Sequence, residues 1–410
     1  MKPPTVIVVG GGAAGCFAAI ACAEAGGQVT VLERAAQPLA KVRISGGGRC
    51  NVTHASFEVG ELIQHYPRGG RKLLGAFSRF QPADTVRWFE ERGVRLKTEA
   101  DGRMFPLTDS SQTIVECLLH ALRRGGAPLR CGAGVGTVQA TPDGHFLAQL
   151  ENGEVLQADR VMLATGGCRG PEGARLATAL GHTLVKPVPS LFTFRAECGW
   201  LSGLAGASVA AARVAVPGTP LAEEGPVLIT HWGLSGPAVL RLSAWGARLL
   251  HDRDYRFPLV INWAPRMRDL DWRVWMTQQR REQGARRVAG TPFPGLPARL
   301  WEQIAHHAGL PPDARWNAAT REQERLLRAR LQSMTIEVNG RSLHKEEFVT
   351  CGGIPLEEVN LITMESRVRP GLFFGGELLD IDGLTGGFNF QAAWTTGWLA
   401  GRAMARPVAG

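Results

Sequence analysis

The stretch TVIVVGGGAAGCFAAIACAEAG, from Thr5 to Gly26, decides the fold. Its β-branched apolar start predicts a strand that is buried on both faces, as in a parallel sheet. The Ala-rich second half predicts a helix that ends at Gly26. The run QVTVLER follows directly and predicts a second strand. A strand, a helix and a strand in this order predict an α/β fold with a parallel sheet.

Three glycines between the first strand and the helix have separate tasks. Gly10, Gly12 and Gly15 form the pattern G-x-G-x-x-G. The first allows the tight turn, the second lets the backbone approach a pyrophosphate, and the third lets helix and strand pack closely. The helix N terminus then offers free N–H groups and a partial positive charge to phosphates. Glu33 ends the second strand, where a carboxylate binds ribose hydroxyls. The motif predicts FAD or NAD.

A glycine-rich loop follows this strand–helix–strand unit in the sequence, and it distinguishes FAD from NAD. Gly46–Gly48 are three consecutive glycines, which are unfavourable inside a helix or a strand. Their bare backbone gives a long cofactor a second close contact, and the nearby Lys41 and Arg49 can pair with phosphate charge. An enzyme that binds only NAD does not need such a loop, so we expect FAD.

The basic charge of the chain is concentrated in one segment. The 410 residues carry a net charge of +9. Residues 264–330 contain 13 Arg, no Lys and 7 Asp or Glu, which makes this segment +6. The pattern favours an acidic partner, with structured RNA the obvious one, and the alternative is a solvated helical face. Four tryptophans of the segment either stack on unpaired bases or form its core: Trp272, Trp275, Trp301 and Trp316.

The remaining composition points to a cytoplasmic protein. Eight cysteines occur without a CxxC pair, which is typical of reduced thiols and argues against disulfide reductase chemistry. The N-terminal apolar run is too short for a signal peptide, and no uninterrupted apolar run is long enough to span a membrane. We expect no metal site and no membrane partner.

Four stretches of the chain resemble the signatures of one bacterial family, the HI0933-like (BaiN/YhiN-type) NAD(P)/FAD-dependent flavoproteins. They are KVRISGGGRCNVTH (41–54), VMLATGGCRGPEG (161–173), LITHWGLSGPAVLRLS (228–243) and GLFFGGELLDIDGLTGGFNFQAAWTTGWLAG (371–401). The resemblance implies a glutathione-reductase-type, Rossmann-like FAD domain, interrupted by an antiparallel β-domain that itself carries a small helical domain. Two positions depart from the family pattern: Phe388 replaces a common Tyr, and Cys351 replaces a small residue.

Strand and helix patterns give the same nested layout. The expected segments are 1–190 and 346–410 for the FAD domain, 191–263 and 332–345 for the β-domain, and 264–331 for the helical domain. The run GAGVGTVQ (132–139) predicts a strand near the adenine rather than a second dinucleotide motif. NAD(P)H would therefore bind transiently over the flavin, or another donor would supply the electrons.

The C-terminal stretch completes the expected cofactor site. Asp380 and Asp382 follow a short strand and suit polar contact with the ribityl chain. The helix NFQAAWTTGWLAG would direct its N terminus at the N1/O2 side of the flavin, where negative charge develops on reduction. The residues that we expect to bind FAD are Gly10, Gly12, Ala13, Ala14, Gly15, Glu33, Arg34, Lys41, Ser45, Gly46, Gly47, Gly48, Arg49, Cys50, Asn51, Val135, Thr165, Gly166, Gly376, Glu377, Asp380, Gly387, Phe388, Asn389, Phe390 and Gln391.

The resemblance also implies a reaction, the reduction of a conjugated C=C bond. Relatives reduce steroid-type enones or convert a uridine of ribosomal RNA to dihydrouridine. Such a reduction needs an acid, and the candidates are Cys50 and His231, each of which has a purely structural alternative. Three hypotheses follow. The chain is an FAD-dependent reductase of a uridine in ribosomal RNA, a reductase of a small enone, or a flavin-binding RNA-associated factor without turnover.

Overall fold

The computed structural model describes residues 3–168, 174–197, 199–342 and 349–407. The chain divides into two compact units. Residues 1–190 with 347–410 form the first unit, and residues 191–346 form the second. The borders expected from the sequence lie after residues 190 and 345, and residues 343–345 fall outside the described part of the chain.

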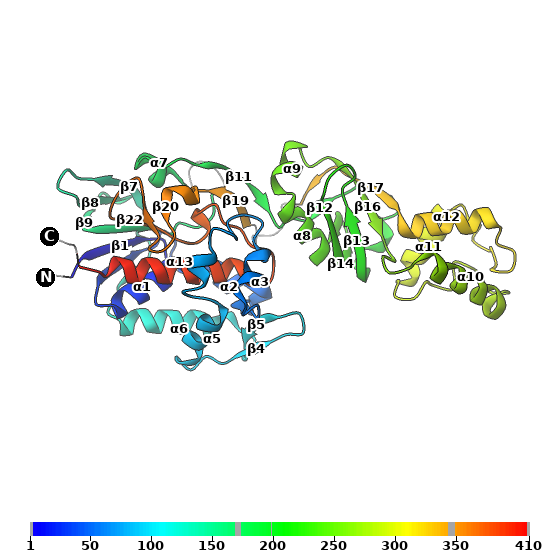
Figure 1. Cartoon of the computed structure of the whole chain (residues 1–410), viewed down its shortest axis with the longest axis horizontal. Helices are drawn as coiled ribbons and strands as arrows, with labels where there is room; N and C mark the ends of the chain where they lie inside the picture. The colour runs from blue at the N-terminus through cyan, green and yellow to red at the C-terminus, as the bar shows by residue number, and fades with distance from the viewer. Residues whose placement is uncertain (1–2, 169–173, 198, 343–348, 408–410) are drawn as a thin grey trace. The chain divides into compact units, whose positions relative to one another are not determined.

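A seven-stranded sheet forms the centre of the first unit (Figure 1). Its strands, in spatial order, are β20 (Val359–Asn360), β21 (Glu365–Ser366), β22 (Leu372–Phe374), β10 (Arg160–Leu163), β1 (Thr5–Val9), β2 (Gln28–Leu32) and β6 (Leu129–Arg130). The five strands from β22 to β6 are parallel. Val8 of β1 pairs with Val31 on one side and Met162 on the other, and all three side chains are buried. These observations confirm the predicted α/β class and the prediction that the first strand is a parallel strand buried on both faces.

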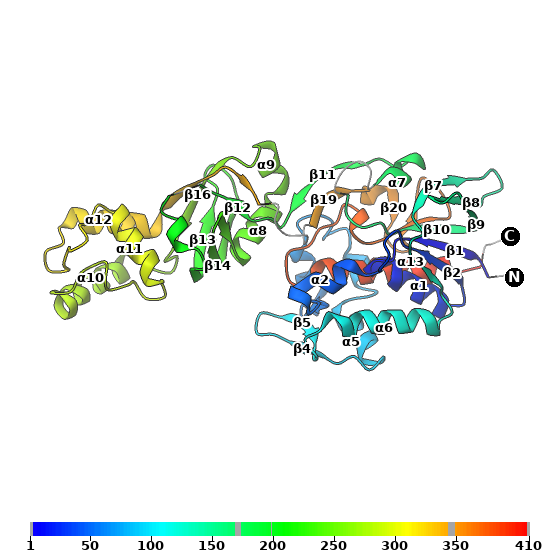
Figure 2. The same cartoon turned by 180° about the vertical axis from the view of Figure 1, so that it is seen from behind.

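Two helices far apart in sequence pack backbone to backbone in this unit. Helix α1 (Ala13–Glu24) and helix α13 (Phe388–Met404) run side by side (Figures 1 and 2). A Cβ atom on Gly401 would lie 2.2 Å from the carbonyl oxygen of Ala18, so only glycine permits this approach. In the described part of the chain, no helix is both long and apolar enough to cross a membrane.

Smaller elements surround the main sheet. A three-stranded antiparallel sheet contains β7 (Val135–Ala140), β8 (Phe146–Leu150) and β9 (Val155–Ala158). A second small sheet contains β3 (Thr53–His54), β5 (Arg103–Pro106) and β4 (Leu96–Thr98). Helices α5 (Pro82–Glu90) and α6 (Ser111–Arg124) also belong to this unit, as do the paired strands β11 (Val185–Ser190) and β19 (Val349–Gly353). Strand β7 confirms the predicted strand for residues 135–139 of GAGVGTVQ, and its place near the adenine stays a prediction.

The glycine-rich stretch begins as a helix. Helix α2 spans Ala40–Gly48, but its backbone leaves the helical conformation at Ser45, whose ψ is 150°. Gly46 and Gly47 then adopt left-handed conformations, with φ values of 57° and 70°. The loop predicted at Gly46–Gly48 is therefore confirmed, and the short helix over residues 40–44 that precedes it was not predicted.

The second unit contains an antiparallel sheet, as predicted. The sheet has seven strands. In spatial order they are β17 (Met334–Val338), β16 (Phe257–Asn262), β13 (Ser208–Ala215), β14 (Ala222–Thr230), β15 (Gly233–Ser235), β12 (Phe194–Arg195) and β18 (Gly340–Arg341). Helix α8 (Pro237–Trp245) packs on β13 and β14, and α9 (Ala247–Asp252) follows it. Alternating burial along β16 and β17 gives this sheet one inward and one outward face.

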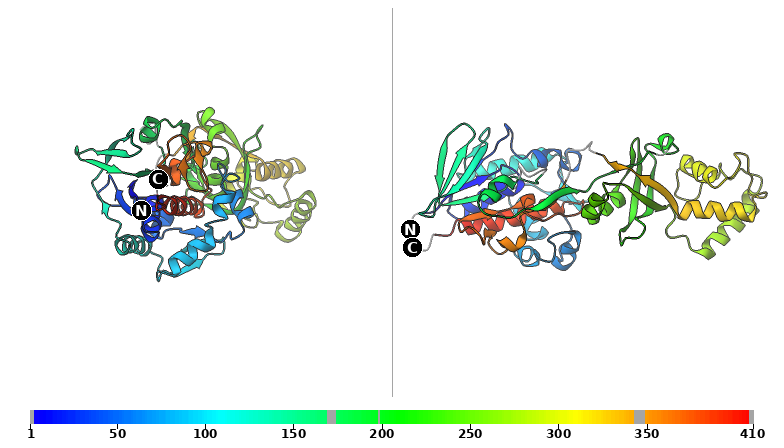
Figure 3. Two further views of the ribbon diagram at one scale, coloured as in Figure 1. Left: turned by 60° about the vertical axis from the view of Figure 1, so that its left-hand side comes forward. Right: turned by 90° about the horizontal axis from the view of Figure 1, so that it is seen from above.

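Three helices of the second unit gather beside its sheet (Figures 2 and 3). They are α10 (Asp269–Gln283), α11 (Ala298–His307) and α12 (Arg321–Gln332). Trp301 and Trp316 expose none of their surface and Trp272 exposes 5%. The ring centroid of Trp275 lies 5.4 Å from that of Trp316 and 5.9 Å from that of Trp301. These rings form the core of the helical segment, so the idea that they stack on RNA bases is wrong for the three buried ones.

A buried histidine of the first unit gives its stability a pH dependence. His182 Nδ1 lies 2.7 Å from Glu358 Oε2, and its Nε2 lies 2.8 Å from Ser366 Oγ. Burial lowers the pKa of His182 below its usual 6.5, although Glu358 opposes that shift. The unfolded chain therefore binds a proton before the folded chain does, and stability is lost as the pH falls below about 6.5.

We expect His182→Gln to flatten this dependence. Urea unfolding of the wild type at pH 7.5 and pH 5.5 should show a lower free energy of unfolding at the acidic pH. In the variant, which has no imidazole at this position, the difference between the two pH values should be smaller. An equal difference in both proteins would contradict the assignment to His182.

Candidate FAD site

The carboxyl ends of four parallel strands bring the predicted cofactor residues together. Strands β22, β10, β1 and β2 are consecutive neighbours in the sheet, and a ligand of an open α/β sheet binds at this edge. The segments that follow these strands carry the predicted contacts Gly376, Glu377, Thr165, Gly166, Gly10, Gly12, Ala13, Ala14, Gly15 and Glu33.

The glycines of the first turn separate into structural and ligand-related ones. A Cβ atom on Gly15 would lie 1.9 Å from the carbonyl oxygen of Gly10, and one on Gly10 would lie 2.3 Å from that of Ala164. Gly12 has a φ of −83°, and a Cβ there would meet no atom within 4 Å. Neither backbone strain nor protein packing requires a glycine at position 12, so the residue fits a site that keeps space for a ligand.

No described side chain caps the N terminus of helix α1, and its first turn contains no acidic residue. Its free N–H groups suit a pyrophosphate. Glu33 lies at the adjacent strand end, where its Oε2 accepts a hydrogen bond from Gly11 N–H at 2.6 Å and its Oε1 accepts one from Ala35 N–H at 2.8 Å. This carboxylate is fixed beside the glycine turn, as ribose binding requires.

Two further predicted cofactor residues occupy different settings. Arg34 is exposed and lies 3.5 Å from a carboxylate oxygen of Glu151. Val135 is a buried residue of β7. The carbonyl of Glu33 accepts a hydrogen bond from Ala133 N–H at 2.8 Å, which links the start of β7 to the end of β2.

The glycine-rich loop is tied to the start of α13. Cys50 N–H donates to Ser45 O at 3.0 Å and closes the loop around the exposed Gly46–Gly48. The amide of Asn51 donates to Thr53 O and accepts from Gly387 N–H, both at 3.0 Å. Two regions that the sequence places more than 300 residues apart thus share one hydrogen-bonded junction.

Both cations predicted to meet phosphate already face protein anions. Lys41 Nζ forms an ion pair with Glu377. Arg49 Nη1 lies 2.6 Å from Glu99 Oε1, and its guanidinium lies 3.9 Å from the centroid of the Phe105 ring. Because both side chains are already paired with carboxylates, the uncapped N terminus of α1 is a better phosphate site than these two cations.

Aromatic rings pack around Phe388, the first residue of α13. Phe388 exposes 2% of its surface and stacks on His65 at 4.3 Å and on His54 at 4.6 Å between centroids. Tyr66 donates its hydroxyl to Phe388 O at 2.7 Å, a contact that the sequence did not reveal because Tyr66 lies in no motif. The amide of Asn389 pairs with both backbone groups of Gly383 at 2.8 Å, which fixes the turn before the helix.

The side chains of later residues of α13 contact other protein groups. Gln391 is fully buried; its Oε1 accepts from Thr53 at 2.6 Å and from Thr85 at 2.8 Å, and its Nε2 donates to Thr395 at 3.1 Å. Its side chain is thus engaged with protein groups. Phe390 stacks on Trp394 at 5.7 Å between centroids.

The two aspartates after β22 differ. Asp380 is partly exposed, as a ribityl contact requires. Asp382 is completely buried, and its carboxylate binds Arg68 and Ser190. The prediction of a ribityl contact is therefore wrong for Asp382, because its oxygens are sequestered inside the protein.

The two candidate acids lie in different units. Cys50 exposes none of its surface and has a left-handed φ of 62°. Burial raises the pKa of its thiol to about 12, opposed by a hydrogen bond with Ser45. His231 is exposed and, with Trp232, forms the two-residue loop between Thr230 of β14 and Gly233 of β15.

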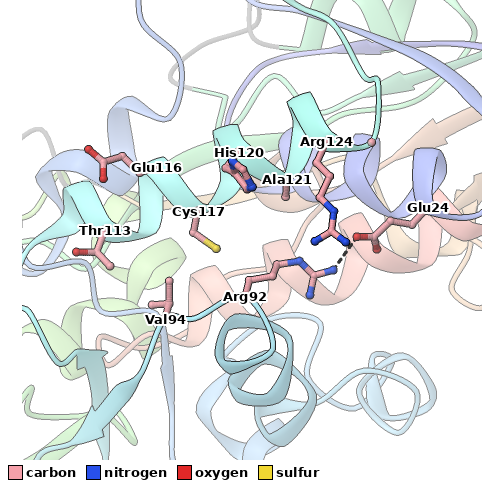
Figure 4. Close-up of a pocket in the computed structure, with 10 residues that line it drawn as sticks. Glu24, Arg92, Val94, Thr113, Glu116, Cys117, His120, Ala121 and Arg124 are labelled. Carbon is pink, nitrogen blue, oxygen red and sulfur yellow. Dashed lines mark hydrogen bonds and ion pairs between the residues drawn. The ribbon is translucent and has the colours of Figure 1, made fainter.

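A separate cavity of about 520 Å³ lies beside α6 (Figure 4). Glu24, Arg92 and Cys117 are among its lining residues, and Arg92 Nη2 lies 2.6 Å from Glu24 Oε1. Burial raises the pKa of the Cys117 thiol to about 11, which makes it unreactive at neutral pH. None of the predicted cofactor residues lines this cavity, so it is distinct from the sheet edge described above.

The strand ends, the uncapped helix and the fixed acidic residue define a Rossmann-type dinucleotide-binding domain, and the comparisons with known proteins make the chain an FAD-dependent oxidoreductase. The chain belongs to the family of HI0933-like proteins, whose Rossmann-domain model matches residues 4–403. The family resemblance and the predicted cofactor are confirmed. The hypothesis of a flavin-binding factor without turnover is set aside, since members of this group are oxidoreductases.

Named relatives cover almost the whole chain. A "Ribosomal RNA dihydrouridine synthase" from Escherichia coli K12 is 31% identical over 96% of both chains. A "3-dehydro-bile acid delta(4,6)-reductase" from Clostridium scindens is 32% identical over 97% of this chain and 98% of the relative.

Solved structures show the same fold at low identity. The 3-ketosteroid-delta4-(5alpha)-dehydrogenase from Rhodococcus jostii RHA1 has a TM-score of 0.52 at 15% identity, covering 98% of this chain and 96% of its own. A flavocytochrome c3 fumarate reductase also has a TM-score of 0.52, at 17% identity, covering 98% of this chain and 78% of its own. These likenesses confirm the glutathione-reductase-type fold.

Proposed function

We propose that this enzyme reduces a C=C bond conjugated to a carbonyl, and that its favoured substrate is a uridine of ribosomal RNA. The open space at Gly12 beside the uncapped end of α1 supports the cofactor part of the proposal. The reaction and the substrate are supported by the names of two relatives and by the basic segment 264–330. Bound FAD, once reduced by two electrons, would supply a hydride to one carbon of the double bond. An acid adds a proton to the other carbon, and a reduced pyridine nucleotide or another two-electron donor restores the cofactor.

The substrate class follows from chemistry shared by the relatives. Uracil carries a C5=C6 bond conjugated to its C4 carbonyl, and a Δ4 enone carries the same arrangement. The names of two relatives refer to these two types of substrate. The +6 charge of residues 264–330 favours the polyanion. The 32% identity to the bile acid reductase supports the second candidate, a reductase of a small enone.

Deleting the gene tests the choice between the two substrates. Ribosomal RNA from the deletion strain should lose dihydrouridine at one position, as measured by mass spectrometry of nuclease fragments, and a plasmid copy should restore it. An unchanged modification profile would exclude the RNA substrate. Reoxidation of the reduced flavin by a steroid enone, but not by RNA, would then establish the small-molecule alternative.

Burial disfavours Cys50 as the proton donor, so we propose His231, the other predicted candidate, for the test. We expect His231→Gln to lower the rate of flavin reoxidation by substrate about 100-fold, the usual contribution of a general acid. Cys50→Ala should keep at least about a third of the wild-type rate, because a thiol with a pKa near 12 and no exposed surface is poorly matched to proton donation.

Stopped-flow absorbance of the FAD-loaded proteins measures both rates, and the flavin spectrum before mixing confirms equal loading. A 100-fold loss in Cys50→Ala with normal His231→Gln would make the thiol the donor instead. Normal rates in both variants would assign the proton to water or to another group.

A further inference from the structure

Two arginines of the second unit face each other across a short antiparallel bridge. Arg287 and Arg315 are paired across this bridge, with Val288 N–H donating to Ala314 O at 2.8 Å and Trp316 N–H donating to the carbonyl of residue 286 at 3.3 Å. This pattern makes Arg287 and Arg315 a non-hydrogen-bonded pair, the type in which opposite side chains approach most closely.

Their charges are not balanced within the described protein. Both side chains are exposed, and no described Asp or Glu forms an ion pair with either. Other arginines of the same segment do have such partners: Arg268 with Asp271, Arg280 with Glu324, Arg325 with Glu322, and Arg328 with Asp269. Like charges directly opposite each other in an antiparallel pair are destabilising, and an anion between them would remove the repulsion.

The buried tryptophans hold the backbone beneath this pair. Trp301 Nε1 donates to Val288 O at 2.7 Å, and Trp316 Nε1 donates to Thr291 Oγ1 at 2.6 Å. Both rings are fully buried. The backbone that carries the two arginines is thus fixed from below, so only their exposed side chains have to order when an anion binds.

We propose that Arg287 and Arg315 form a clamp for the phosphodiester backbone of RNA. The guanidinium fork matches phosphate oxygens, which recur along an RNA strand. The assignment of RNA, rather than another phosphate-bearing partner, rests on the proposed function. The tryptophans, which cannot stack on bases, contribute by holding the clamp in place, and the clamp positions the RNA without reading its sequence.

The test compares two double variants of the FAD-loaded protein with equal loss of charge. R287Q/R315Q removes the clamp. R281Q/R325Q removes two exposed arginines of the same segment that are paired with Glu282 and Glu322. Anisotropy of a fluorescent RNA hairpin, titrated at several salt concentrations, gives the affinity and its salt dependence.

We expect R287Q/R315Q to weaken RNA binding at least tenfold. The slope of log affinity against log salt should fall by about 1.4 to 1.8, since two phosphate contacts of about 0.7 to 0.9 each are lost. The control should stay within about twofold of wild type. Flavin spectrum, thermal unfolding and the rate of flavin reduction by dithionite should match in all three proteins.

Other outcomes separate the clamp from the proposed function. Equal weakening in both double variants, or in neither, would overturn the clamp while leaving an RNA substrate intact. A wild-type protein that shows no salt-dependent binding of the hairpin would overturn both. Vesicles of phosphatidylglycerol that bind wild type and lose binding in R287Q/R315Q, without a matching effect on RNA, would assign the pair to a lipid surface and overturn the RNA proposal.

Discussion

Gly12→Val should yield a folded protein that purifies without the yellow colour of flavin. A Cβ atom at Gly12 meets no protein atom within 4 Å, and its φ of −83° is open to any residue, so the fold should tolerate the change. The added side chain instead fills the space where the backbone approaches the pyrophosphate. We expect the affinity for FAD to fall at least about 100-fold, which corresponds to ~2.7 kcal/mol.

Two other glycines provide matched controls for this experiment. Gly60→Val adds the same side chain at a position of α3 (Val59–Leu62) that is also open, and should keep its flavin. Gly15→Val should fail to fold with or without FAD, because its Cβ would overlap the carbonyl of Gly10 at 1.9 Å. Fluorescence titration of the apoproteins with FAD and circular dichroism measure the two properties separately. A Gly12→Val protein with wild-type affinity would contradict the pyrophosphate site.

Arg68→Met should destabilise the first unit by about 3–5 kcal/mol. The guanidinium of Arg68 binds both oxygens of the Asp382 carboxylate, whose side chain is 0% exposed, and Ser190 Oγ donates to the same carboxylate at 2.7 Å. Removing the arginine leaves a buried charge without its partner, which costs far more than an ion pair at the surface contributes.

A surface pair and a double variant make this prediction specific. Lys72→Met breaks the ion pair with Glu357, in which both side chains are at least half exposed, and should cost at most about 1 kcal/mol. Arg68→Met with Asp382→Leu removes both charges and should recover most of the stability lost in the single variant. Urea unfolding of the apoproteins gives all four free energies. A loss in Arg68→Met no larger than that in Lys72→Met would show that the buried pair contributes little.

Local sequence was sufficient for the nucleotide-binding elements. The glycine spacing and the flanking apolar strands predicted β1, α1 and β2, and Glu33 lies beside the glycine turn where the spacing placed it. These features depend on residues that are neighbours along the chain, so backbone preference and periodicity describe them well. The fully buried Trp301 and Trp316 were ambiguous, because an aromatic residue beside arginines looks the same in sequence whether it lies in a core or on a surface.

By itself the sequence determined the class of fold, because steric rules for glycine and apolar periodicity act over short stretches, and the glycine-rich loop with the family resemblance determined the cofactor. Only the tertiary structure decided which charged side chains are free to act. Asp382 meets Arg68, and Arg287 meets Arg315, through contacts between distant segments. The energy of a charge depends on the burial and the partners that such contacts create, so the same residue type is sequestered at one position and available at another.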